Sequence, residues 1–103
     1  MPLSCDKEGF LRNLDDWSES VADELAILEE IELTPDHWEI IQLVRHYHQE
    51  YRLFPANRVL VNKIKEAFGE DKGNSIHLMK LFTGRPRRVI AKISGLPKPS
   101  NCD

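Results

Sequence analysis

Residues 33–50 read LTPDHWEIIQLVRHYHQE and contain the strongest helix signal in the chain. Thr34 offers a capping hydroxyl, Pro35 suits the first helical position, and Asp36 places an acid near the positive end of the helix dipole. The pattern predicts a helix that runs to about Glu50. Its inward face is expected to contain Trp38, Ile40, Ile41, Val44 and Tyr47.

Further helices are predicted on both sides of this segment. Their ranges are 14–30, 55–69 and 74–82, and a basic amphipathic stretch follows at 87–93. Ser18 or Asp15 is a candidate cap for the first range, and Gly69 supplies a left-handed stop for the second. The fold class is therefore mainly α, in one compact domain of a size that 103 residues allow.

The chain changes character at residues 95–103, which read GLPKPSNCD. The two prolines disfavour a helix and favour an extended backbone. Residues 1–94 are therefore expected to form a helical body, and residues 95–103 an extended arm with Cys102 at its tip. A thiol at the end of a projecting arm can enter a partner's pocket, which a thiol in the core cannot do.

Charge is divided unevenly along the chain. Residues 1–54 contain 4 Lys/Arg and 13 Asp/Glu, whereas residues 55–103 contain 10 Lys/Arg and 4 Asp/Glu. Two interpretations stay open: a polar surface that orients a partner, or an attraction between the halves that helps to compact the fold. The overall net charge of −3 argues against a dedicated nucleic-acid binder, which usually has a strongly basic domain.

Several segments, in order along the chain, resemble the TusE/DsrC family. They are GFL at 9–11 with Trp17, LTPDHW at 33–38, PANRVL at 55–60, KGNS at 72–75, LF at 81–82, and GLPKP at 95–99 followed by the penultimate Cys102. The ordered set covers about residues 8 to 102. The resemblance implies a small, mostly helical protein with a helix-turn-helix-like core, and a short N-terminal strand pair would make it α+β.

The resemblance also implies an activity. Family members carry sulfur as a persulfide on the penultimate cysteine, which matches Cys102 here. The DsrC branch has a second arm cysteine, and that position is Ala91 in this chain. The match therefore favours the TusE branch: a sulfurtransferase that receives sulfur from a TusBCD-like donor complex and passes it toward a tRNA 2-thiouridylase-like acceptor. Contact with tRNA is expected only indirectly.

The candidate site residues fall into three groups. Cys102 is the catalytic residue. The arm is presented by Gly95, Leu96, Pro97, Lys98 and Pro99, and Gly95 offers a hinge. The residues expected to dock an acidic partner are Arg85, Arg87, Arg88 and Lys92. Cys5 matches no family cysteine, and its role stays open.

Two rival functions remain: a partner of dissimilatory sulfite reductase, against which Ala91 argues, and a helix-turn-helix-like DNA-binding regulator. We expect no cofactor and no metal site, because His46 and His48 point in different directions on one helix. The sequence shows no apolar run long enough to span a bilayer and no secretory signal. A cytoplasmic location with two free thiols is therefore expected.

Overall fold

The computed structural model describes residues 4–99, and within that range the protein is helical. Its elements are a 3₁₀ helix η1 (Leu14–Asp16) and five α-helices: α1 (Glu19–Leu28), α2 (Pro35–Tyr51), α3 (Asn57–Phe68), α4 (Ser75–Phe82) and α5 (Pro86–Ile93). The mainly α prediction is confirmed. The family resemblance also allowed a short N-terminal strand pair. In the described range this region has an isolated antiparallel bridge between Cys5 and Leu11 in place of a strand pair.

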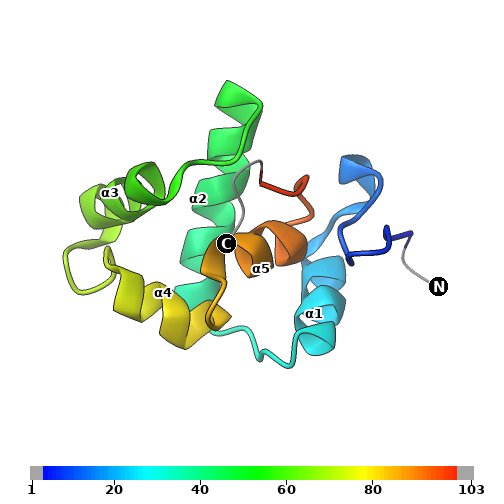
Figure 1. Cartoon of the computed structure of the whole chain (residues 1–103), viewed down its shortest axis with the longest axis horizontal. Helices are drawn as coiled ribbons and strands as arrows, with labels where there is room; N and C mark the ends of the chain where they lie inside the picture. The colour runs from blue at the N-terminus through cyan, green and yellow to red at the C-terminus, as the bar shows by residue number, and fades with distance from the viewer. Residues whose placement is uncertain (1–3, 100–103) are drawn as a thin grey trace.

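Helix α5 lies at the centre of the molecule and packs against α1, α2 and α4, whereas α1 and α3 lie on opposite sides (Figure 1). Its residues Ile90, Ala91 and Ile93 are fully buried. The amphipathic pattern predicted for 87–93 therefore produces a helix whose apolar face is enclosed by neighbouring helices. Burial of this face favours folding, since removal of apolar area from water is the dominant favourable term.

The helix predicted from residue 34 is confirmed, and α2 ends at Tyr51. A histidine takes the place that glutamate or glutamine has in the usual capping box: Nδ1 of His37 accepts a hydrogen bond from the Thr34 backbone N–H at 3.0 Å. Nε2–H of His37 donates to the Leu81 carbonyl at 2.8 Å. Because His37 is only 5% exposed, this pair of bonds ties the start of α2 to the end of α4 inside the core.

The prediction of one helix over residues 14–30 is wrong in its first part. Trp17 has extended backbone angles and separates η1 from α1. Ser18 caps α1, and its side chain accepts a hydrogen bond from the Val21 N–H. The break turns the Trp17 side chain toward the end of α5, a contact that periodicity along the local sequence does not reveal.

The remaining helices begin and end close to their predicted limits. Helix α3 starts at Asn57, two residues after Pro55, and stops at Gly69 with a φ of 97°. Asn74 caps α4 by accepting a hydrogen bond from the His77 N–H at 2.9 Å. Across residues 4–99, no helix is both long enough and apolar enough to traverse a membrane.

Candidate functional site

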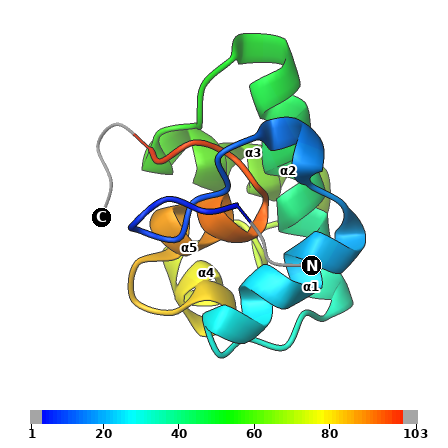
Figure 2. The same cartoon turned by 90° about the vertical axis from the view of Figure 1, so that its right-hand side faces the viewer.

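The predicted arm is described as far as Pro99, and over this stretch it lies against the body. Residues 96–99 form neither helix nor strand, and Leu96 is 2% exposed. In Figure 2 this red segment lies on the same side of the molecule as the blue N-terminal segment. We call residues 95–99 the arm root. Cys102, the predicted catalytic residue, lies outside the described residues.

The arm root begins with a glycine-based helix stop. The Gly95 N–H donates to the Lys92 carbonyl at 3.1 Å, and the Leu96 N–H donates to the Ala91 carbonyl at 2.9 Å. This pair of bonds, with φ of 71° at Gly95, is a Schellman motif. In a Schellman motif the residue after the glycine commonly packs its apolar side chain against the last turn of the helix, and Leu96 is buried at this position. The chain thus leaves α5 in a defined direction.

Trp17 and Arg45 hold the last turn of α5 from the outside. Nε1–H of Trp17 donates to the Ile93 carbonyl at 2.9 Å. A guanidinium N–H of Arg45 donates to the Ser94 carbonyl, and the guanidinium lies 3.8 Å from the centre of the Trp17 ring. Backbone carbonyls at a helix C-terminus have no hydrogen-bond donor within the helix. Trp17 and Arg45 therefore supply the donors that the Ile93 and Ser94 carbonyls lack. A Cβ on Gly95 would lie 2.4 Å from Cδ1 of Trp17.

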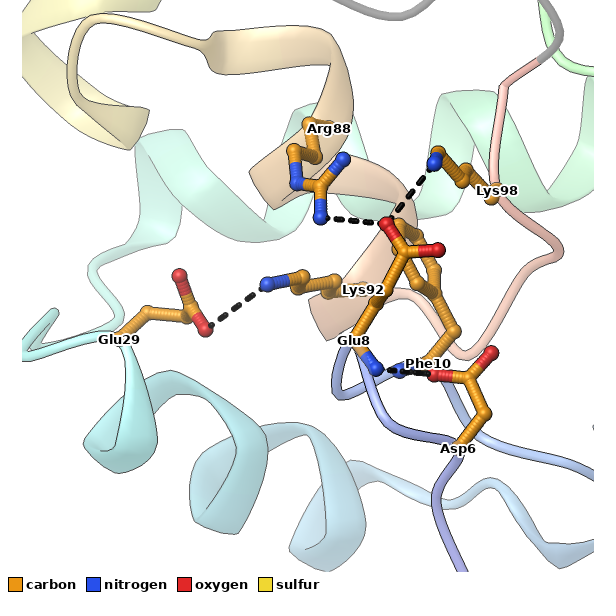
Figure 3. Close-up of polar contacts among 7 residues, drawn as sticks. All are labelled: Asp6, Glu8, Phe10, Glu29, Arg88, Lys92 and Lys98. Carbon is orange, nitrogen blue, oxygen red and sulfur yellow. Dashed lines mark hydrogen bonds and ion pairs between the residues drawn. The ribbon is translucent and has the colours of Figure 1, made fainter.

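The arm root is also held by an acid from the N-terminal turn. A carboxylate oxygen of Glu8 accepts hydrogen bonds from Arg88 of α5 and from Lys98, each at 2.8 Å (Figure 3). These bonds, first that from Lys98 and then that from Arg88, lower the pKa of Glu8. Oδ1 of Asp6 accepts the N–H groups of Glu8 and Phe10, which keeps the turn closed. Glu8 therefore links the N-terminal turn to α5 and to the arm root, which lie 80 and 90 residues further along the chain.

The four residues predicted to dock a partner differ in their surroundings. Arg85 is exposed. Arg87 is 5% exposed, and its Nε–H donates to the Pro55 carbonyl at 3.2 Å. Arg88 pairs with Glu8, and Lys92 pairs with Glu29 at 3.6 Å. The structure therefore brings Arg88 and Lys92 together beside Phe10, and it places Arg87 in a structural contact.

A cavity of about 270 Å³ separates the arm root from the end of α2 and the connection to α3. It is lined by His48, Arg52, Leu53, Phe54, Pro97, Lys98 and Pro99. The pKa of His48 is lowered, chiefly by burial and also by the nearby charges of Arg52 and Arg45. The lining is basic through Arg52 and Lys98, and the lowered pKa biases His48 toward its neutral form at neutral pH.

The second cysteine lies close to the body. Cys5 is a half-buried free thiol that packs against the hydrophobic core, and its backbone carbonyl accepts a hydrogen bond from Nε–H of Arg12 at 3.1 Å. A nucleophilic thiol needs access to its partner. Cys5 is thus less suited than a tail cysteine to enter a partner's pocket.

Sequence reasoning missed Trp17, Arg45 and Glu8 as residues that hold the arm root. Trp17 falls within the range predicted as one helix over 14–30 and within the family pattern, and the sequence indicates no role for Arg45 or Glu8. Their partners lie 76, 49 and 90 residues away along the chain. Local patterns contain no signal for contacts at such separations; only the GF…W opening of the family pattern pointed toward this region.

Comparison with known proteins gives consistent matches over nearly the whole chain. A family model described as "DsrC like protein" matches residues 1–102. Sulfurtransferase TusE of Photorhabdus laumondii is 45% identical over 100 residues, which are 97% of this chain and 90% of the relative. The sulfurtransferase TusE homolog of Haemophilus influenzae is 47% identical, over 97% of this chain and 92% of that protein.

Two solved structures share the architecture. The solution structure of Allochromatium vinosum DsrC superposes with a TM-score of 0.86 at 43% identity, covering 96% of this chain and 88% of that one. The crystal structure of the oxidized gamma-subunit of the dissimilatory sulfite reductase from Archaeoglobus fulgidus gives 0.87 at 38% identity, covering 98% and 92%. The predicted mainly α fold with its compact core is thereby confirmed.

Proposed function

The chain belongs to the family of DsrC-like proteins and is a sulfurtransferase that works as a carrier in a sulfur relay, and from this premise we propose that the sulfur travels as a persulfide on Cys102. The observation that carries the proposal is the match to TusE relatives over 97% of the chain, together with a family model that extends to residue 102. The anchored arm root supports it, because residues 95–99 are held in one place directly before the segment that contains Cys102.

The proposed reaction is a transfer of sulfane sulfur between thiols. The Cys102 thiolate attacks the outer sulfur of a donor persulfide, a new S–S bond forms, and the donor's S–S bond breaks to release the donor thiolate. The same exchange then runs from the Cys102 persulfide to an acceptor thiolate. Each step conserves atoms and electrons, and its rate depends on thiolate fraction and access.

The anchored root lowers the cost of presenting the thiol. Gly95 fixes the exit direction, Leu96 is buried, and Lys98 is paired with Glu8. Pro97 and Pro99 restrict the backbone on both sides of Lys98. A pre-organised segment loses less conformational entropy when a partner binds the residues beyond it. We therefore propose that residues 95–99 act as the presenting base of the arm.

The partners follow from the TusE branch. The chain acts with other sulfur-transfer proteins of a relay; we propose that these are a TusBCD-like donor complex and a tRNA 2-thiouridylase-like acceptor, so that tRNA is met only through the acceptor. Of the four basic residues predicted for docking, the exposed Arg85 is the one best placed to meet an acidic partner directly. We propose the cytoplasm as the compartment, since a persulfide relay needs thiols kept reduced.

Partnership with dissimilatory sulfite reductase is the second candidate, because the oxidized gamma-subunit of that enzyme from Archaeoglobus fulgidus superposes well on this chain. Ala91 opposes this reading. It occupies the position of the second arm cysteine of the DsrC branch, and its side chain is fully buried at the end of α5. Because residue 91 is alanine, no disulfide can form between this position and Cys102.

The test is intact-protein mass spectrometry after incubation with a cysteine desulfurase and free cysteine. Wild type, Cys102→Ser and Cys5→Ser are compared. We expect one added sulfur on wild type and on Cys5→Ser, and none on Cys102→Ser. If wild type takes up no sulfur even when an intermediate relay protein is supplied, the carrier mechanism on Cys102 is refuted.

A further inference from the structure

The C-terminal end of α1 and the connection to α2 form an open groove with an apolar floor. Its volume is about 520 Å³, and its apolar lining includes Ile27, Ile31 and Leu33. Ile27 is 71% exposed, and the adjacent Leu28 is 70% exposed. Ile27 therefore leaves apolar surface in water inside the groove, and Leu28, which does not line the groove, adds exposed apolar surface beside it. Exposed apolar surface that gathers in one place usually marks a binding site.

The rim of the groove is acidic. Asp23, Glu30 and Glu32 line it, and no lysine or arginine is among its lining residues. Within residues 4–99 none of these three carboxylates forms an ion pair, whereas the neighbouring Glu29 points away to Lys92 of α5 (Figure 3). Glu30 follows the C-terminal end of α1, where an acid is unfavourable to the helix dipole, so the stability of α1 does not account for this residue.

We propose that this groove is a docking surface for a basic amphipathic helix of a partner protein. The apolar stripe of such a helix would cover Ile27, Ile31 and Leu33, and its Lys or Arg side chains would meet Asp23, Glu30 and Glu32. Binding of an amphipathic helix in a groove is a recurrent recognition mode, and charge complementarity gives it orientation and rate. An anionic ligand is disfavoured by the same rim.

The groove lies apart from the arm root. The α1–α2 connection is at the bottom of both Figure 1 and Figure 2, whereas the red arm root is toward the top. A partner held at the groove leaves the arm root uncovered. The proposal extends beyond the sulfur-carrying role of Cys102, because it assigns a second surface that does not involve a thiol and can be tested without sulfur chemistry.

The test uses backbone amide NMR of the full chain, kept reduced, titrated with synthetic peptides. The probe is a Leu/Lys amphipathic helix of about five turns. One control peptide has the same composition in scrambled order, and the other replaces every Lys by Glu. We expect shifts concentrated in residues 23–33 with the Leu/Lys helix, weaker binding of the scrambled peptide, and no binding of the Glu version.

Three variants sharpen the assignment. Ile27→Ser is expected to weaken binding about tenfold, since it removes an aliphatic side chain from the contact. Ile76→Ser on α4 is its matched control, because Ile76 is 68% exposed, and it should bind as wild type does. Glu30 has a left-handed φ of 60°. Glu30→Asn keeps a residue that tolerates this conformation, removes the charge, and should weaken binding several-fold with less dependence on salt.

Four results would overturn the proposal. They are equal binding of the scrambled peptide, shifts located outside residues 23–33, equal effects of Ile27→Ser and Ile76→Ser, and concentration-dependent shifts of the groove amides without peptide. The last result would identify a second copy of this chain as the occupant. None of these readouts depends on Cys102, so sulfur uptake by the same sample separates failure of the groove from failure of the carrier mechanism.

Discussion

Replacement of Gly95 by alanine is expected to destabilise the protein far more than the same change at the unconstrained Gly84. Gly95 combines two constraints: its φ is 71°, and a Cβ would lie 2.4 Å from Cδ1 of Trp17. Trp17 has little freedom to move, because its Nε1–H is bonded to the Ile93 carbonyl and the Arg45 guanidinium covers its ring. The added methyl group therefore meets a held aromatic side chain.

The magnitude follows from the two constraints. A left-handed conformation costs a non-glycine residue about 1–2 kcal/mol. Overpacking against a fixed neighbour costs roughly 1–3 kcal/mol. We expect Gly95→Ala to lower the free energy of unfolding by about 2–5 kcal/mol, a large part of the roughly 5–15 kcal/mol that holds a typical domain folded.

The other glycines separate the two contributions. Gly69 has a φ of 97° and a ψ of 170°, a region that is essentially restricted to glycine, with open space around its Cβ position. Gly69→Ala therefore tests backbone strain without crowding, in a different backbone region from that of Gly95. Gly73 has no positive φ, but its Cβ would lie 2.5 Å from Cα of Lys65, so Gly73→Ala tests crowding alone. Gly84 has neither constraint, and Gly84→Ala is the neutral reference.

The assay is equilibrium denaturation of the four variants at one pH, with the slope compared to confirm two-state unfolding. The loss for Gly95→Ala should exceed that for Gly84→Ala by about 2–5 kcal/mol, the sum of backbone strain and crowding. If Gly95→Ala costs no more than about 1–2 kcal/mol, the cost of a left-handed backbone, the clamp by Trp17 is not rigid, and the argument that it fixes the direction in which the chain leaves α5 fails.

Three further predictions concern the same region. Glu8→Gln should lower the free energy of unfolding above about pH 4.3, the pKa of an unfolded glutamate. Because two cationic partners lower the folded pKa of Glu8, the advantage of wild type should shrink below about pH 4.3 and disappear as the pH falls through the lowered folded pKa. A difference in stability that persists in strong acid would contradict the ion-pair interpretation. Trp17→Phe should cost about 1 kcal/mol by leaving the Ile93 carbonyl without its donor, and an unchanged denaturation midpoint would show that water replaces the indole. Leu96→Ala should cost roughly 2–4 kcal/mol, since Leu96 is 2% exposed; a loss within the error of the midpoint would mean that the arm root is not packed in solution.

The helices could be predicted because their signals are local. Thr34, Pro35 and Asp36 mark the start of α2, Asn74 caps α4, and Gly69 ends α3, each through contacts within one or two turns. The helix over residues 14–30 failed at its first part. There the apolar spacing of Trp17 fits a helix, but its side chain is drawn to the end of α5, and a tertiary contact prevails over a weak local preference.

The sequence by itself determined the helical segments, the change of character at Gly95 and the family resemblance, because caps, periodicity and motifs depend on neighbouring residues. Only the tertiary structure decided how the arm root is held. Trp17, Arg45 and Glu8 reach it from segments remote in sequence, and the enclosure of α5 turns Arg87 from an expected docking residue into a buried donor to the Pro55 carbonyl. Such contacts arise from packing of distant segments, which no local pattern encodes.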